Sequence, residues 1–208
     1  MLIIMTMMII ASTACSNLLK QDEEQVIAEI DAASNSQRDT TIWSGKAVEL
    51  FNQGNQSLEQ DTEKSATYFN QAILIEPKME AAYFNLMKLY YVSENRQKMQ
   101  QIFLKAEKEN LLSARILTLV GIEKRAQGEF KNAEKYYQLA LKKDANYLVV
   151  LVNMAILQDL YLHNLTTAQN YYVQYQQQLI TQGKEDNRVK NWLADIKRRI
   201  AKAAKEKT

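Results

Sequence analysis

Side chains that could carry out chemistry are few in this chain of 208 residues, and they do not cluster along it. The sequence contains one cysteine, Cys15, and one histidine, His163, which excludes an internal disulfide and a histidine-based metal cluster. It contains no nucleotide-binding loop, zinc-ligand spacing, nucleophile elbow or metalloprotease helix. We therefore expect no catalytic residue, no metal site, no cofactor and no small-molecule substrate.

Two isolated polar residues stand out near the middle of the second half of the chain. Asp159 follows a run of apolar residues, where a lone carboxylate is more often a binding contact or a helix-end partner than an acid catalyst. His163 stands beside Asn164 and is expected to be an exposed turn residue. The formal net charge of +2 gives no electrostatic support to general nucleic-acid binding.

The cysteine follows an apolar run, MLIIMTMMII at residues 1–10, and the four small residues 11–14 lie between the run and the cysteine. This run is too short to span a bilayer as a helix, which needs about 20 residues. The arrangement resembles a bacterial lipoprotein signal, in which a small residue precedes a cysteine that is lipidated and becomes the mature N-terminus. The resemblance implies a signal peptide at residues 1–14 and a lipid on Cys15. Ser16, the residue after the cysteine, is of a type that outer-membrane lipoproteins often have there, so the resemblance also implies an outer-membrane location. The alternatives are a plain signal peptide and a buried apolar helix with an incidental cysteine.

Residues 15–41 are expected to form an N-terminal helix, at about residues 17–33, and a linker. The linker, SNSQRDTT at residues 34–41, is polar and lacks periodicity. Two interpretations remain equal: the segment holds the following domain away from a membrane, or the helix docks on the first repeat as a cap.

The best-defined pattern lies between residues 114 and 147 and predicts two amphipathic helices, Ala114–Gln127 and Phe130–Lys143, separated by a break at Gly128. Apolar residues of the second helix recur at spacings of three and four. Small residues stand where two helices must approach closely, at Ala133 and Ala140, with Tyr137 between them. We expect these three side chains to be buried at helix–helix contacts.

This spacing of small and aromatic residues resembles the tetratricopeptide repeat (TPR), whose period is about 34 residues. Related patterns occur on both sides, so that the repeats lie at about residues 47–79, 80–113, 114–147 and 148–182. The turn between helices is one residue short in the first repeat and one residue long in the fourth. The sequence therefore predicts an all-α fold, a right-handed TPR solenoid at residues 42–182 with an N-terminal helix.

Residues 183–208 are expected to form a C-terminal capping helix. Its apolar stripe is made by Val189, Trp192 or Leu193, Ile196 and Ile200, and it would cover the stacking surface that the last repeat of a solenoid otherwise exposes. The basic tail of this helix is interpreted as a solvated face, and contact with anionic lipid or an acidic partner is the alternative.

The TPR resemblance implies a binding groove, because partners of this family lie along the concave face formed by the first helix of each repeat. Transfer of the family's groove positions to this sequence gives Phe51, Asn55, Phe84, Lys88, Tyr91, Arg115, Ile122, Arg125, Val152, Ile156 and Asp159. Such a groove mixes apolar anchors with cations, and it would suit a segment with hydrophobic residues and an acidic one. The alternative is that Phe51, Phe84 and Ile156 are buried by the N-terminal helix or by an adjacent turn of the solenoid.

These features predict a non-enzymatic scaffold for protein–protein interaction on the periplasmic side of a Gram-negative envelope. The chain resembles TPR lipoproteins that help assemble type IV pili or secretion pores, or TPR proteins of TonB-type systems. The expected contacts are envelope proteins, held in the groove, and a membrane, reached through the N-terminal lipid. A soluble periplasmic adaptor or chaperone without a lipid is the alternative.

Overall fold

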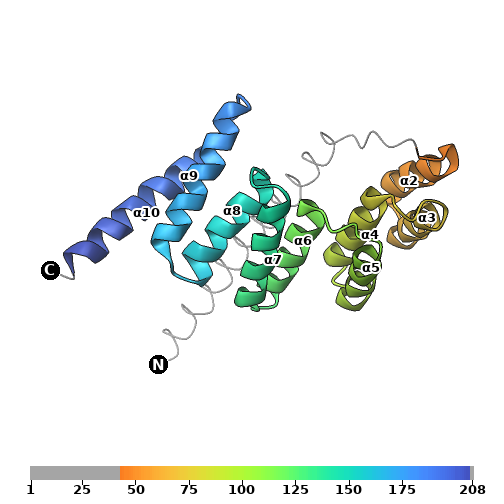
Figure 1. Ribbon diagram of the computed structural model, residues 1–208, viewed down its shortest axis with the longest axis horizontal. Coiled ribbons are helices and arrows are strands. Elements are labelled where there is room, and N and C mark those ends of the chain that lie inside the picture. The colour runs from red at the N-terminus through yellow and green to blue at the C-terminus, as the bar shows by residue number, and fades with distance from the viewer. Residues whose placement is uncertain (1–42, 207–208) are drawn as a thin grey trace, which may run out of the picture. The chain divides into compact units, whose positions relative to one another are not determined.

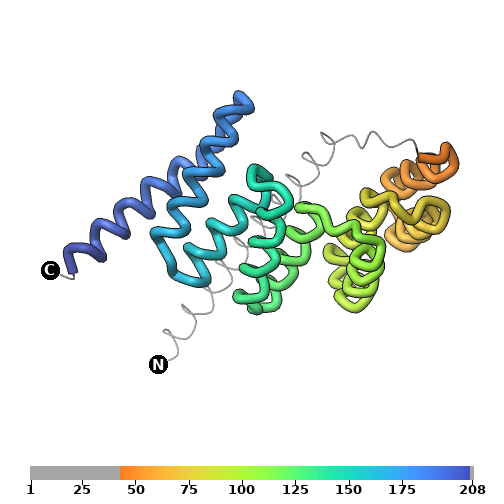
Figure 2. The backbone as a smooth tube through the Cα atoms, viewed as in Figure 1, coloured from red at the N-terminus to blue at the C-terminus, as the bar shows by residue number. Residues whose placement is uncertain are grey.

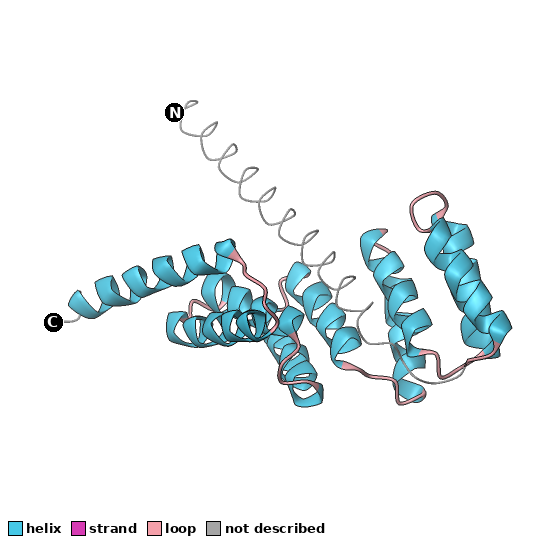
Figure 3. Cartoon of the chain, turned by 90° about the horizontal axis from the view of Figure 1, so that it is seen from above, coloured by secondary structure: helices cyan, strands magenta, loops and turns pink. Residues whose placement is uncertain are grey.

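The computed structural model describes residues 43–206, which lie within one compact unit. Cys15, the predicted signal peptide and the predicted N-terminal helix lie outside these residues. Across residues 43–206 the chain forms nine α-helices and one π-helical turn, and it forms no strand (Figures 1 and 3). The prediction of an all-α protein is therefore confirmed for the part of the chain that the structure describes.

The helices follow one another as hairpins, and each hairpin packs on the next (Figure 2). The bounds of the hairpins are α2 (Gly45–Ser57) with α3 (Thr62–Ile75), α4 (Glu80–Val92) with α5 (Arg96–Lys108), and α6 (Ala114–Ala126) with α7 (Phe130–Lys143). In the fourth hairpin, α8 (Leu148–Ile156) continues into the π-helical turn η1 (Leu157–Tyr161) and pairs with α9 (Leu165–Thr181). The chain then forms α10 (Asn187–Lys205), which packs on α9. Below, α2, α4, α6 and α8 are called the first helices, and α3, α5, α7 and α9 the second helices.

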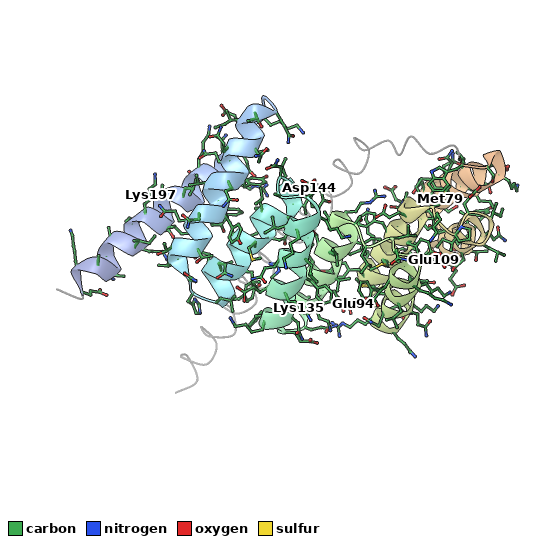
Figure 4. The ribbon with its side chains drawn as sticks, viewed as in Figure 1. Met79, Glu94, Glu109, Lys135, Asp144 and Lys197 are labelled. Atoms are coloured by element: carbon green, nitrogen blue, oxygen red, sulfur yellow. The ribbon has the colours of Figure 1, made fainter. Side chains whose placement is uncertain are left out.

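The turn inside three of the hairpins uses the same backbone conformation. Glu94, Gly128 and His163 follow α4, α6 and η1 respectively, and each has a positive φ, of 54°, 76° and 53°. A residue in this left-handed region ends a helix because it lets the backbone N–H groups that follow bond to the last carbonyl groups of the helix. His163 is exposed, as the sequence predicted. Figure 4 shows Glu94 in such a turn, at the opposite end of the hairpins from Asp144, which follows α7.

Side-chain caps fix where several helices begin. Ser44, Asp61, Asn95 and Ser113 each accept a hydrogen bond from a backbone N–H in the first turn of the helix that follows. Such a cap satisfies one of the donors that a helix leaves unpaired, and it stabilises the helix by roughly 1 kcal/mol. Asp186 caps α10 in the same way.

Hairpin packing relies on glycines that stand beneath aromatic rings. Tyr137 of α7 lies directly over Gly121 of α6, and Phe69 of α3 lies over Gly54 of α2, where an added Cβ would come within 2.6 Å of the ring. Tyr137, Ala133 and Ala140 are all fully buried, as predicted. The small residues are therefore needed because they let the two helices of a hairpin approach across a large aromatic side chain.

The extra residue of the fourth repeat is accommodated by a change of helix type. The backbone N–H of Leu162 donates to the carbonyl of Leu157, five residues earlier, at 3.0 Å. This bond defines a π-helical turn, which absorbs one added residue without breaking the helix. The turn places Gln158 and Asp159 in the interior, at 3 % and 5 % exposure.

Helix α10 covers the end of the repeats as the sequence predicted. Val189, Leu193 and Ile196 are buried in a cluster with Tyr172 and Leu179 of α9, and Trp192 and Ile200 pack at its edge. The opposite side of α10 is solvated, and Lys197, labelled in Figure 4, lies there.

Candidate partner-binding surface

The predicted groove residues lie on successive first helices, and most of them contact a neighbouring helix. On α2, the half-buried Phe51 packs on Phe69 with ring centroids 5.7 Å apart. The side-chain oxygen of Asn55 accepts a hydrogen bond of 2.7 Å from the amide of Asn85 on α4. These two residues of the first repeat therefore connect α2 with α3 and with α4.

The junction between the second and third repeats is an ion-pair cluster around Glu80. The guanidinium of Arg115 donates to both oxygens of this carboxylate, with Nε at 3.0 and 2.9 Å from them. Ser113 donates its hydroxyl hydrogen to the same carboxylate at 2.5 Å. The Arg115 guanidinium also lies 4.9 Å from the centre of the Phe84 ring, which is fully buried. In this structure Arg115 and Phe84 thus join α4 to α6.

The junction between the third and fourth repeats buries a cation. Arg125 on α6 is 4 % exposed, and its Nη2 donates to the side-chain oxygen of Asn153 on α8 at 3.3 Å. Its guanidinium also lies 5.8 Å from the centre of the Tyr161 ring in η1. Ile122, one turn earlier on α6, is fully buried. This part of the predicted groove offers almost no exposed surface.

The last predicted groove residues belong to the interior of the fourth repeat. Val152 and Ile156 on α8 are 2 % and 5 % exposed. Asp159 accepts a 2.7 Å hydrogen bond from Nη1 of Arg199 on α10, with which it forms an ion pair. Burial works against the charge of Arg199, but its bonds to Asp159 and Asp195 outweigh this effect and raise the pKa of the guanidinium. Asp159 thus forms an ion pair with the capping helix, and its sequence context did not predict this role.

The predicted groove residues divide into two groups by exposure. Six are buried to 5 % exposure or less: Phe84, Ile122, Arg125, Val152, Ile156 and Asp159. Five are half-buried: Phe51, Asn55, Lys88, Tyr91 and Arg115. Phe51, Lys88 and Tyr91 are therefore members of the predicted groove that keep part of their surface exposed.

Sequence reasoning missed the intramolecular partners of these residues. Glu80, Asn85, Asn153 and Arg199 each pair with a predicted groove residue that lies between 28 and 40 positions away in the chain. A separation near the repeat period is the one signal that could have indicated them, because residues one repeat apart lie on neighbouring first helices.

A second concave surface lies between α5 and α6, where the second and third hairpins stand further apart than their neighbours (Figure 1). It is a cleft of about 360 Å³. Met99, Phe103 and Val120 supply its apolar part, and an ion pair of 3.0 Å between Arg96 and Glu123 crosses it. The repeat pattern gave no sign of this cleft, because the cleft depends on how far apart two hairpins stand.

Within residues 43–206, no group of three or more histidine, cysteine, aspartate or glutamate side chains is arranged to hold a metal ion. None of the helices in this range combines the length and the apolar character that crossing a membrane requires.

Comparison with known proteins identifies the fold. No protein-family model matches the sequence, and no curated protein matches it either. Among solved structures, the chain is similar to pilF of Pseudomonas aeruginosa, with a TM-score of 0.64 and 17 % identity over 76 % of this chain and 70 % of that one.

Two further solved structures share this likeness. PilW, described as a widely conserved type IV pilus biogenesis factor, has a TM-score of 0.54 and 21 % identity over 80 % of this chain and 74 % of its own. YrrB, a TPR protein with an unusual peptide-binding site, has a TM-score of 0.50 and 17 % identity over 64 % of this chain and 68 % of its own. The fold is that of the TPR solenoids, which confirms the predicted fold class.

Proposed function

We propose that this TPR chain is a non-enzymatic scaffold of the cell envelope that holds a segment of a partner protein along its first helices. The observation that carries the proposal is the solenoid itself. It presents a row of first helices on which Phe51, Lys88 and Tyr91 remain half-buried rather than covered. Aromatic and cationic side chains that keep part of their surface exposed are typical of binding hot spots.

The likeness to pilF and to PilW favours an envelope machine, such as a pilus, as the assembly that the scaffold serves. Secretion and TonB-type systems belong to the same proposal. The apolar run before Cys15 supports a lipid anchor that keeps the protein on the periplasmic side of the outer membrane. A soluble periplasmic adaptor is the second candidate, and it differs from the first only in lacking the lipid.

Site-specific photocrosslinking in the native host tests the binding surface. A photoreactive amino acid at position 88 or 91 should capture one defined envelope protein. The same group at position 100 or 131, which are exposed on the second helices α5 and α7, should not capture that protein. Capture of the same protein from all four positions would show that the first helices are not the binding surface.

The anchor is tested separately from the binding surface. The Cys15→Ala variant should leave the membrane fraction with its helical circular dichroism spectrum unchanged, and labelled fatty acid should be incorporated by the wild-type chain alone. A wild-type chain that carries no label and stays outside the membrane fraction would favour the adaptor without a lipid, whereas membrane association that survives the substitution would point to the N-terminal segment or the basic C-terminal helix as the attachment. Either result leaves the crosslinking test of the binding surface valid.

A further inference from the structure

Helix α10 concentrates the positive charge of the described chain. Residues 187–206, which comprise α10 and its C-cap, contain seven lysine and arginine residues and only two acidic ones, Asp195 and Glu206. Residues 43–186 contain equal numbers of basic and acidic side chains. The net charge of the described residues therefore comes from α10 alone, although the formal net charge of the whole chain is only +2.

Five of these cations share the side of α10 that faces away from α9, and together they are called the basic face. Its members are exposed, with the exposed alanines 194 and 201 between them: Lys190, Lys197, Arg198, Lys202 and Lys205. At 3.6 residues per turn the five fall within about 140° of the helix circumference. Asp195 and Glu206 lie outside this arc, so the basic face contains no acidic residue.

Ion pairs leave most of the charge of the basic face in place. Lys190, Arg198 and Lys202 each contact one carboxylate, and every side chain in these three pairs is at least 42 % exposed. Such exposed pairs contribute little, because water screens them. One of the carboxylates, that of Asp195, is also shared with Arg199. The basic face therefore keeps a positive potential that extends into the solvent.

The shape of α10 restricts the kind of partner that this charge can attract. The distance from Lys190 to Lys205 is about 22 Å along the axis at 1.5 Å per residue. The helix packs on α9, and its C-terminal end extends beyond the hairpins (Figures 1 and 3). Residues 201–206 are all exposed. A convex rod of this kind cannot enclose an extended protein segment, whereas a planar surface contacts it along its whole length.

The composition of the basic face also differs from that of a protein interface. Protein interfaces are depleted in lysine and alanine, and they depend on buried anchors. Four of the five cations here are lysines, and the large apolar residues Trp192 and Leu193 pack in the cluster with α9 instead. A lysine ammonium group is a point charge on a flexible stem, and it does not require the fixed geometry that an arginine fork recognises.

An anionic lipid surface is planar and diffusely charged, so it is complementary to the basic face in both shape and charge. Clusters of four to eight cations on a helix bind anionic headgroups, and each cation strengthens binding roughly fivefold. We propose that the basic face of α10 binds the anionic headgroups of a membrane surface. This binding goes beyond the proposed scaffold function, and it does not require a lipid on Cys15.

The contact is electrostatic and does not involve insertion into the bilayer. An interfacial helix inserts through an apolar face, but Val189, Leu193 and Ile196 of α10 are buried against α9. Salt screens the attraction over about 10 Å at 0.1 M. A salt wash should therefore release a chain held in this way, unlike a chain held by a lipid. The first helices stay accessible to a partner protein, because α10 packs on a second helix.

Cosedimentation of the full chain with vesicles tests the proposal, in a Cys15→Ala background so that no lipid is attached. Vesicles with equal amounts of phosphatidylcholine and phosphatidylglycerol should bind the chain about tenfold or more tightly than vesicles of phosphatidylcholine alone. The neutral vesicles report any binding by the apolar residues 1–10. Added salt should remove the difference. Equal binding to both kinds of vesicle at low salt would overturn the proposal.

Three double variants test the role of the basic face, and circular dichroism verifies that each is folded. Lys197→Gln with Lys205→Gln should weaken binding to the phosphatidylglycerol vesicles about tenfold or more. The matched control, Lys135→Gln with Lys142→Gln, removes the same charge from exposed positions of α7 and should leave binding within about twofold. Lys197→Arg with Lys205→Arg should bind as the wild type does, because it keeps the charge.

Polyglutamate and duplex DNA are the probes for the two other kinds of anionic partner. Binding to either one through Lys197 and Lys205, without a preference for phosphatidylglycerol vesicles, would assign the basic face to an acidic protein or to nucleic acid and would overturn the proposal. A control variant of α7 that loses as much vesicle binding as the glutamine variant of α10 would overturn it as well, because the attraction would then come from total charge.

Discussion

Substitution of Gly121 by alanine tests whether close approach beneath an aromatic ring controls hairpin packing. A Cβ at this position would lie 2.5 Å from Cδ1 of Tyr137 and closer still to Cε1. Carbon atoms in good contact are about 3.5–4.0 Å apart, so the ring and α6 must separate by about 1 Å. Tyr137 is fully buried, so its ring cannot move into solvent without breaking its packing.

The expected magnitude follows from two opposing effects. Overpacking of a close-packed interior costs about 1–3 kcal/mol, and the overlap with two ring atoms places this case in the upper half of that range. Replacing a glycine inside a helix by alanine stabilises the helix by about 1 kcal/mol. Gly121→Ala should therefore lower the free energy of unfolding by about 1–2 kcal/mol, which corresponds to a fall of roughly 2–8 °C in the unfolding midpoint.

Urea unfolding followed by circular dichroism measures this difference, and two controls isolate its cause. Gly45→Ala, in the first turn of α2, adds a Cβ with no atom within 4 Å and should change stability by less than about 0.5 kcal/mol. In a Tyr137→Leu background, Gly121→Ala should cost much less, because the ring that it strikes is absent. A stability equal to that of the wild type, or the same loss in both backgrounds, would refute the explanation.

Two further predictions concern the attachment of α10. Arg199→Ala should destabilise the protein by roughly 2 kcal/mol, because it leaves the carboxylate of Asp159 buried at 5 % exposure without its ion-pair partner. Asp159→Asn should cost less, since Arg199 is partly exposed and also pairs with Asp195. Chemical unfolding of both variants measures which one loses more stability. At the start of α10, burial raises the pKa of Asp186, but the bonds of Asp186 to Arg188 outweigh burial and hold its pKa below the usual 3.8. The stability that Asp186 contributes is therefore present above pH 3.8 and is lost as the pH falls through the lower pKa of the folded state. Acid unfolding should show this loss in the wild type and not in Asp186→Asn, and equal acid sensitivity of the two would contradict it.

The sequence predicted helix positions well where packing depends on residues that are near one another in the chain. The predicted bounds of the third repeat, Ala114–Gln127 and Phe130–Lys143, differ from α6 and α7 by a single residue. That accuracy has a physical cause, because Gly121, Ala133 and Tyr137 must occupy fixed places for two helices to pack around one ring. Gly128 then permits the turn between them, with its φ of 76°.

Exposure along the first helices was less predictable, because it depends on pairs of residues from different repeats. The repeat position of Arg115 suggested a groove cation, but the carboxylate that binds it, on Glu80, belongs to the preceding repeat. Asp159 is similar, since its partner Arg199 lies on the capping helix. Periodicity indicates which face of a helix a residue occupies, and it does not indicate which charged groups meet on that face.

The cleft between α5 and α6 has a consequence for how the chain folds during synthesis. In a solenoid, a repeat is stabilised by its immediate neighbours, so cooperativity is weakest where two neighbours share the least surface. The first two hairpins share a buried cluster, in which Leu50 and Ala72 of the first hairpin pack with Met79 and Ala82 at the start of the second. They can therefore fold as a unit while the later repeats are still emerging from the ribosome. Native-state hydrogen exchange should then divide the protein into two cooperative units, with the boundary between Lys108 and Ala114.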